Sequence, residues 1–376
     1  MTTSTLGSRR ADDAAQFDSP IPRRCADRAP LTPARLVKAK AAYTTGRVPL
    51  APDTRLLCGE GTVPEPGDVV LARVSAIGQH KRLELSNGRR AHLFPGDEIL
   101  VAYGHRYAPD QFLAEVPCEL GPCDLAAAGG VASRVVASHA AIGEPTRLEP
   151  IGLLCGADGR RVNLRDWALP RLALPVPAVP TVAIVGTSMN AGKTTTAAGV
   201  VRGLRAAGLR PGAAKVTGTG AGGDVWLLRD AGADPVLDFT AAGLASTYLA
   251  PLPVVEETFD LLRGHLAAAG ADVIVVEVAD GVFQRETAEL VAGARFRDAI
   301  DGVIFAAGDA LGAIAGVSWL RERGVPVLAV SGVLSASPLA MREAERALDV
   351  PVLDLEALGA AEIAAALTVE TVAAKA

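Results

Sequence analysis

The run VAIVGTSMNAGKTTT, residues 182–196, constrains the fold more than any other part of the chain. Its apolar start, 182–185, suits a buried parallel strand, and the stretch from Thr195 to Ala207 has helical apolar spacing. Between them lie Gly186, five further residues and then Gly192-Lys193-Thr194. A strand, a glycine-rich loop ending in Gly-Lys-Thr, and a helix are the context of a phosphate-binding loop.

This loop predicts contacts to nucleotide phosphates. Glycines let backbone N–H groups approach phosphate oxygens, and the start of a helix supplies unpaired N–H donors at the positive end of its dipole. We expect Lys193 to reach the outer phosphates and the Thr194 hydroxyl to bind Mg²⁺. The predicted nucleotide contacts are Gly186, Thr187, Asn190, Ala191, Gly192, Lys193, Thr194 and Thr195.

Composition narrows the class of protein further. A chain of 376 residues suits two domains and a tail. The formal net charge is −5, and no part of the chain forms a basic domain. Both observations argue against nucleic-acid binding. Neither an uninterrupted apolar stretch of membrane length nor an apolar signal core at the N-terminus is seen, so we expect a cytoplasmic protein without a membrane partner.

Changes in pattern divide the chain into four parts. Residues 1–30 are rich in Ser, Thr, Arg, Asp and Pro and predict a flexible arm. Residues 31–169 predict a small, mainly antiparallel β-domain, and 170–180 a stiff proline-spaced linker. In 181–376, strands and helices alternate, which predicts an α/β domain with a parallel sheet covered by helices on both faces.

Two segments of the predicted β-domain carry local signals. Asn87-Gly88, between KRLELS and RRAHLF, predicts a hairpin. The segment DLAAAGGVASRVVASHAAIG, residues 124–143, is alanine-rich, and we expect it to be helix-like but interrupted by glycines.

Charged residues follow the strands of the predicted α/β domain. Lys215 ends the second strand beside a Thr/Gly-rich loop and should point to the same cleft as Lys193. Glu277 closes the apolar strand DVIVVEV, where a buried acid is costly unless it meets a cation or water. Asp224 is interpreted either as a plain helix N-cap or as a second carboxylate near Mg²⁺, and Asp280 either as a site acid or as a capping or turn residue.

The longer loop, GTSMNAGKT, resembles that of dethiobiotin synthetase, which also has a lysine after its second strand and a Val-Glu stretch similar to VVEVADG. The resemblance implies that Lys215 binds the γ-phosphate or the acid being activated. It also implies that Glu277 helps to hold Mg²⁺ and that Thr217 and Thr219 contact substrate or phosphate. Asp280 and Gly281 stand where that enzyme has glycines, and Asp280 is a candidate substrate residue of this chain. The run KVTGTGAGGDVWLLRDAGA, which contains Asp224, resembles molybdopterin-guanine-dinucleotide accessory proteins.

The resemblance covers residues 181–376 and has limits. Ser188, Met189 and Asn190 replace the acidic and hydroxyl residues of the dethiobiotin synthetase loop, and the signature lysine of MinD-type ATPases is missing after Gly186. The loop also looks like that of a P-loop family linked in one branch to D-amino-acid metabolism. The β-domain resembles none of these families.

Three functions remain open. The first is a Mg-ATP-dependent enzyme, with Lys193 and Lys215 as catalytic residues, that activates a small acid or amine by phosphoryl transfer or ligation. The second is a nucleotide-binding accessory or switch protein that docks a partner enzyme through the β-domain. The third is a metabolite-modifying protein whose nucleotide is not ATP, because an acyl carrier with a 3′,5′-phosphate could also use such a loop.

Two further expectations concern the ligand and the assembly. The loop 331–335 lacks the Asn/Thr-Lys-x-Asp signature of GTPases, which favours ATP as the cofactor with Mg²⁺. Asp238 and the run 246–248 are candidates for the side of the cleft away from the nucleotide. A homodimer is compatible with this interpretation.

Overall fold

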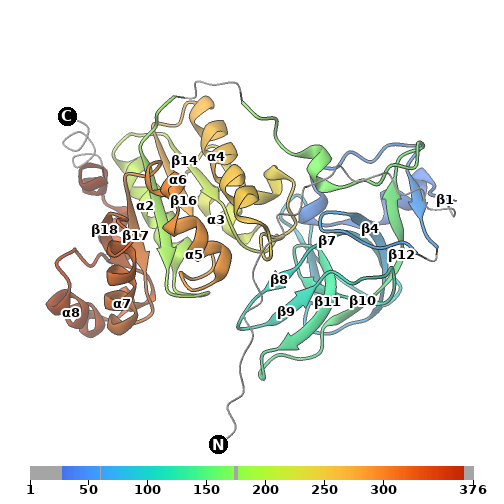
Figure 1. The fold of residues 1–376 in the computed structure, drawn as a ribbon, viewed down its shortest axis with the longest axis horizontal. Coiled ribbons are helices and arrows are strands. Elements are labelled where there is room, and N and C mark those ends of the chain that lie inside the picture. Colours follow the sequence, from blue (N-terminus) through green and yellow to red (C-terminus); the bar gives the residue numbers. More distant parts are fainter. Residues whose placement is uncertain (1–27, 60, 173–176, 368–376) are drawn as a thin grey trace, which may run out of the picture.

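The computed structural model describes residues 28–59, 61–172 and 177–367. Two lobes are apparent in Figure 1, one built mainly of strands and one built of a sheet with helices around it. Most of the predicted arm, residues 1–27, lies outside the described residues, whereas residues 28–30 form the first strand.

The N-terminal lobe is a mainly antiparallel ten-stranded sheet with the order β1-β3-β12-β4-β7-β11-β9-β8; β10 pairs with β11 and β12, and β2 with β7. Only the β2–β7 and β7–β11 pairs are parallel among the strand pairs of this described sheet. The strands are β1 Arg28–Pro30, β2 Lys40–Ala41, β3 Arg55–Leu57, β4 Val69–Ala76, β7 Glu98–Tyr103, β8 Arg106–Tyr107, β9 Phe112–Glu115, β10 Cys123–Ala127, β11 Val131–Ser138 and β12 Thr146–Cys155.

The remaining elements of this lobe are short. The predicted hairpin at Asn87-Gly88 is confirmed, because β5 and β6 pair antiparallel across it and Gly88 has a φ of +81°. The bounds are β5 Arg82–Glu84, β6 Arg90–His92, helix α1 Pro33–Lys38, and the 3₁₀ turns η1 Tyr43–Thr45 and η2 Leu164–Trp167.

The helix-like interpretation of residues 124–143 is wrong, because the segment forms strands β10 and β11. Gly129 and Gly130 make the turn between them, and Gly130 has a φ of +100°. A Cβ at Gly130 would collide with Ala42, and one at Gly129 with Gly220. The glycine pair therefore serves a turn packed closely against two other segments, and the alanines are small residues of buried strands.

The C-terminal lobe is the predicted parallel sheet. Six strands lie in the order β15-β14-β16-β13-β17-β18, and every pair is parallel. The strands are β13 Thr181–Gly186, β14 Pro211–Lys215, β15 Val236–Asp238, β16 Val273–Glu277, β17 Gly302–Ala306 and β18 Val327–Ser331.

Helices cover both faces of this sheet, as predicted. Along β13, Val182 and Ile184 face the core formed with α2, α3 and α9, while Ala183 and Val185 face the core formed with α4 to α8. The helices are α2 Lys193–Ala206, α3 Gly223–Asp230, α4 Leu252–Ala268, α5 Arg285–Ala292, α6 Ala294–Arg297, α7 Ala310–Arg321, α8 Pro338–Ala347 and α9 Leu355–Gly359, with 3₁₀ turns η3 Phe239–Ala242 and η4 Val333–Ala336.

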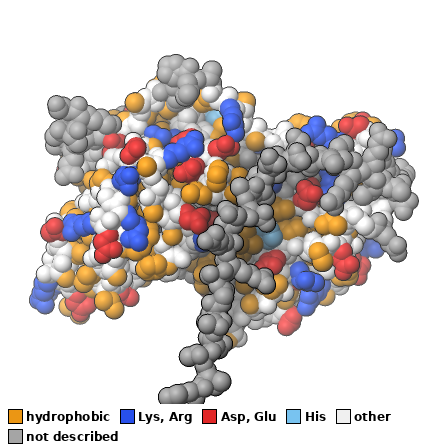
Figure 2. Space-filling model, viewed as in Figure 1, with side chains coloured by type: hydrophobic (Ala, Val, Ile, Leu, Met, Phe, Trp, Pro, Cys, Tyr) orange, Lys and Arg blue, Asp and Glu red, His pale blue; other side chains and the backbone are white. Residues whose placement is uncertain are grey.

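Two further features concern the charges on the surface and the length of the described helices. On the face shown in Figure 2, acidic and basic side chains are interspersed over both lobes. Within the described ranges, no helix is both long enough and apolar enough to span a bilayer.

Candidate functional site

The loop between β13 and α2 has the shape that close backbone contacts require. Gly192 adopts a φ of +93° and Asn190 a φ of +64°, so the chain turns twice through the left-handed region before α2 begins. A Cβ at Gly186 would lie 2.7 Å from the carbonyl oxygen of Ala306, and one at Gly192 would lie 3.0 Å from Gly332 Cα. Both glycines are therefore required where neighbouring strand ends approach the loop.

Lys193 is the first residue of α2 and folds back over the loop. Its Nζ donates a hydrogen bond to the carbonyl oxygen of Ser188 at 2.7 Å, and 6% of the residue is exposed. Burial lowers the pKa of Lys193. No side chain caps the start of α2 within the described residues, so its N–H donors face the same loop as the ammonium group.

Three charged residues end adjacent strands in register. On the three parallel strands β15, β14 and β16, Lys215 pairs with Asp238 on one side and with Glu277 on the other. Lys215 thus lies between two carboxylates at the carboxyl edge of the sheet. Asp238 itself is used structurally: it accepts a hydrogen bond from Tyr43 Oη at 2.8 Å and caps η3 through Thr240 N.

Thr194, Asp224 and Glu277 form a cluster of oxygen atoms. The Thr194 hydroxyl lies 3.2 Å from Asp224 Oδ1 and 3.1 Å from Glu277 Oε1. Glu277 is 2% exposed, burial raises its pKa, and its Oε2 has no hydrogen-bond partner among the described residues. Asp224 is not the helix cap, because α3 starts after Gly222 and the carboxylate points to Thr194 and Lys215.

Lys215 neutralises this cluster. Its Nζ donates a hydrogen bond to Asp224 and lies 3.6 Å from Glu277 Oε1. Burial disfavours the ammonium ion, but Glu277 and Asp224 outweigh it and raise the pKa of Lys215. In turn, although burial opposes its ionisation, Asp224 has a lowered pKa because of Lys215. The structure therefore brings the predicted lysine and both predicted metal acids into direct contact.

Of the three predicted substrate residues, Thr217 and Asp280 lie near the lysines, whereas Thr219 is part of a backbone bridge. Thr217 is 1% exposed and donates its hydroxyl to the carbonyl oxygen of Ala279, so it supports the segment that carries Asp280. Thr219 lies in a backbone bridge with Ser246. Burial raises the pKa of Asp280, and the nearby charges of Lys193 and Lys215 act in the opposite direction. Asp280 thus lies within the electrostatic reach of the two lysines, and Thr217 positions it.

The remaining predicted loop residues contact neighbouring strand ends or face solvent. Thr187 N donates to Ala306 O at 3.0 Å, Ala191 is buried and accepts from Val333 N at 3.0 Å, and Thr195 is exposed on the first turn of α2. The contact to Val333 places the predicted base loop, 331–335, beside the phosphate-binding loop. Ser331 turns away from it, since its buried hydroxyl donates to Leu353 O.

A hairpin of the N-terminal sheet also reaches this loop. Asp110, between β8 and β9, accepts a hydrogen bond from Asn190 Nδ2 at 2.9 Å, and its buried Oδ1 has no partner among the described residues. Arg106 is 6% exposed and lies near Asp110 and Asp280. Neither residue is identifiable from the sequence alone, because contacts between segments 80 residues apart leave no local pattern.

A second contact joins the lobes behind Asp224. Glu84 is 3% exposed and accepts hydrogen bonds from Gly222 N at 3.0 Å and from Trp226 Nε1 at 3.1 Å. Gly222 directly precedes α3, which carries Asp224. The N-terminal lobe therefore supports the segment that positions one of the two cluster acids.

We expect Glu84→Ala to lower the free energy of unfolding by about 2 kcal/mol, because it leaves two donors without an acceptor. Urea unfolding measures the change. Glu115→Ala, at the exposed last residue of β9, is the matched control and should have a small effect. Equal destabilisation by the two substitutions would contradict a structural role for Glu84.

No protein-family model matches the chain, and no curated protein matches it. Among solved structures it is similar to the signal recognition particle receptor FtsY from Elizabethkingia anophelis, with 16% identity over 51% of this chain and 67% of that chain and a TM-score of 0.35. For the same receptor in complex with GDP, the identity is 17%, the coverage 48% and 58%, and the TM-score 0.34.

A third similar structure is the signal recognition particle 54 kDa protein from Aeropyrum pernix K1 in complex with GDP. Its identity is 18%, over 53% of this chain and 49% of that chain, with a TM-score of 0.34. The chain thus spans about half to two thirds of these proteins. Likeness at this level says nothing about function, so the interpretation of the site rests on its own geometry.

Proposed function

We propose that residues 186–195 bind the phosphates of a nucleoside triphosphate with Mg²⁺ and that the protein is an ATP-dependent enzyme activating a small acid or amine. One observation carries the proposal: the Thr194 hydroxyl lies within 3.2 Å of both Asp224 and Glu277, directly beside Lys193 and Lys215. Transfer of a phosphoryl group requires that the group is positioned and its charge neutralised. The ammonium groups of the two lysines and the cluster of oxygen atoms provide the side chains for this in one cleft.

The oxygen cluster fits Mg²⁺. Magnesium in phosphate sites is held by one or two carboxylates, a hydroxyl, substrate phosphates and water rather than by an all-protein cage. The buried, unpartnered Oε2 of Glu277 supports a ligand there. When bound, the ion would supply positive charge to the phosphates.

The two lysines have different parts in this proposal. Lys193 would exchange its bond to Ser188 O for phosphate oxygens, at little cost because that partner is a backbone carbonyl. Lys215 would leave Asp224 when a cation neutralises the carboxylate, and would then meet the γ-phosphate or the acid being activated. The backbone N–H groups at the start of α2 would hold the remaining phosphate charge.

The accessory or switch function is the second candidate, and the contact of Glu84 with Gly222 favours it. This bond links the N-terminal lobe to the segment that carries Asp224. Any shift of Asp224 on nucleotide binding would be transmitted to the N-terminal lobe, which is proposed to dock a partner enzyme. This function is compatible with either a monomer or a homodimer.

The deciding experiment measures phosphate release from ATP and from GTP in the presence of a library of small acids and amines. An enzyme should show turnover that one chemical class accelerates. A switch should show no stimulation by any small molecule. Equal rates with ATP and GTP would contradict the preference for ATP that the loop 331–335 indicates.

We expect Glu277→Gln to raise the Mg²⁺ concentration for half-maximal turnover by about tenfold, because so few carboxylates hold the ion. Nucleotide affinity without Mg²⁺ should change much less. A magnesium titration of the turnover rate measures this, with Glu289→Gln on the exposed face of α5 as the matched control. An unchanged titration would remove Glu277 from the metal site.

A further inference from the structure

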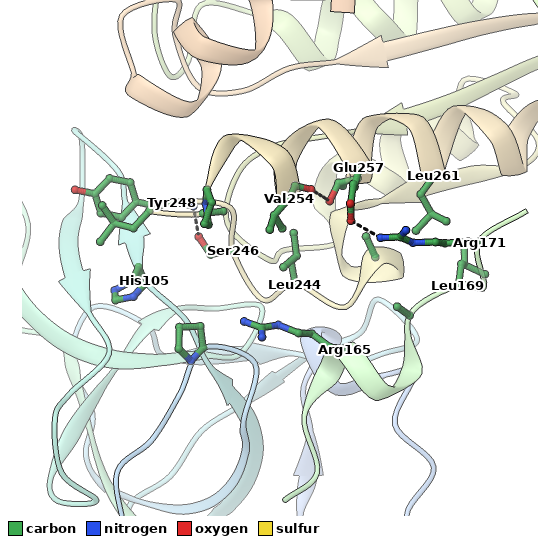
Figure 3. A pocket seen from close by; sticks show the side chains of 17 residues that line it. His105, Arg165, Leu169, Arg171, Leu244, Ser246, Tyr248, Val254, Glu257 and Leu261 are labelled. Atoms are coloured by element: carbon green, nitrogen blue, oxygen red, sulfur yellow. Dashed lines mark hydrogen bonds and ion pairs between the residues drawn. The ribbon is translucent and has the colours of Figure 1, made fainter. Parts of the chain in front are cut away.

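A cavity of about 570 Å³ lies between the N-terminal lobe, the segment after η2 and the start of α4 (Figure 3). The volume is in the range of small-molecule sites. None of the phosphate-binding loop residues 186–195 lines it, so it is a separate site. Its walls are mostly apolar and include Pro66, Leu169, Leu244, Val254 and Leu261.

The charged residues that line the cavity leave a net positive charge. Arg171 is neutralised by Glu257, with Nη2 and Oε2 at 2.7 Å. Arg165 makes no ion pair with any described residue. Figure 3 shows its side chain extending below Leu244, with the guanidinium group directed into the cavity. An unpaired guanidinium beside apolar walls favours a carboxylate ligand, which it can bind through two parallel hydrogen bonds.

Two further features favour an anion. His105 Nδ1 accepts a hydrogen bond from Val116 N at 3.2 Å, so the neutral ring carries its proton on Nε2 as a donor. Burial lowers the pKa of His105, which keeps the ring neutral. The 17-residue helix α4 begins at the cavity behind Pro251, which provides no capping side chain, and its positive dipole end adds to the field of Arg165.

We propose that this cavity binds a small organic acid, with its carboxylate at Arg165 and its apolar body along Leu244, Val254 and Leu261. The inference goes beyond the proposed function, because the site lies outside the phosphate-binding loop and binding there needs no nucleotide.

The cavity wall is shared with the nucleotide cleft. Ser246 and Tyr248 line the cavity, and between them Thr247 Oγ1 accepts a hydrogen bond from Gly218 N at 2.8 Å. Tyr248 also packs against Tyr107 of β8, with ring centroids 5.4 Å apart. An acid held in the cavity would therefore contact the segment that supports the loop after Lys215.

Calorimetric titration of the full chain, without nucleotide, tests the proposal with octanoate as the probe and octanamide as its neutral analogue. We expect saturable binding of one octanoate per chain and about tenfold weaker binding of octanamide, because a hydrogen bond to a charged group is lost. Arg165→Gln should weaken octanoate binding about tenfold and leave octanamide binding unchanged. Val254→Trp should weaken the binding of both probes by filling the cavity.

Arg160→Gln, which alters another exposed arginine of the same lobe, is the matched control and should bind octanoate as the parent does. Equal affinities of octanoate and octanamide would overturn the assignment of Arg165. The same applies if octanoate does not saturate one site, or if Arg160→Gln and Arg165→Gln weaken it equally. Because no nucleotide is present, failure here leaves the proposed nucleotide site unaffected.

Discussion

Lys193→Ala is expected to lower nucleotide turnover by about 10²–10³-fold, which corresponds to about 3–4 kcal/mol of lost electrostatic stabilisation. The ammonium group lies at the start of α2, over a loop whose backbone donors face the same site. In that position it would stabilise the negative charge that develops on the phosphates in the transition state. Initial rates of phosphate release at saturating Mg²⁺ measure the loss.

The same substitution should leave the fold intact, because Lys193 forms no ion pair that its removal would break in the described residues. Burial already disfavours its charge. Thermal unfolding of the variant checks this, and Lys38→Ala, on exposed α1, serves as the control for turnover. Hydrolysis at the parent rate by a folded Lys193→Ala variant would exclude the loop from catalysis.

The parallel sheet was predictable because its signals are local. Val182–Val185 and residues 273–276 are apolar runs long enough for buried strands, and each ends at a glycine or an acid that marks the carboxyl edge. Chain connectivity then places these ends at one edge of the sheet. Lys215 lies next to Glu277 because β14 and β16 are neighbours in the sheet. Local sequence patterns do not predict this strand order.

Residues 124–143 show where composition misleads. Alanine is a good helix former, but here Leu125, Ala126 and Ala132 fill buried strand positions next to a tight glycine turn. The turn glycines pack against Ala42 and Gly220, and the burial of the strand residues outweighs the intrinsic helix preference of alanine. The need for small side chains was visible in the sequence, but the segments against which they pack were not.

The parts of the site supplied by the N-terminal lobe could not be predicted for the same reason. Tyr43, Glu84 and Asp110 each contact the C-terminal lobe across 80 or more residues of sequence. Single polar residues in short strands are ordinary surface features until the fold brings them to a partner. Their roles depend on how the two lobes meet, which no motif in the chain specifies.

Lys215→Met is expected to separate catalysis from nucleotide binding. Turnover should fall about 10²-fold, because the substitution removes the charge that would meet the transferring group. ADP affinity should change by less than about twofold, since ADP lacks the γ-phosphate that this lysine would contact. Calorimetry with ADP and turnover with ATP measure the two effects. Loss of ADP binding as large as the loss of turnover would place Lys215 on the wrong side of the cleft.

The substitution should also make stability depend on magnesium. Without the lysine, Asp224 and Glu277 remain in the cleft without a neutralising cation, and breaking such a buried arrangement costs about 3–5 kcal/mol. Mg²⁺ bound to the two carboxylates would restore the charge balance and stabilise the folded state by mass action. We therefore expect Mg²⁺ to raise the melting temperature of Lys215→Met much more than that of the parent or of Lys81→Met. Equal shifts in all three proteins would show that the two acids do not form a metal site.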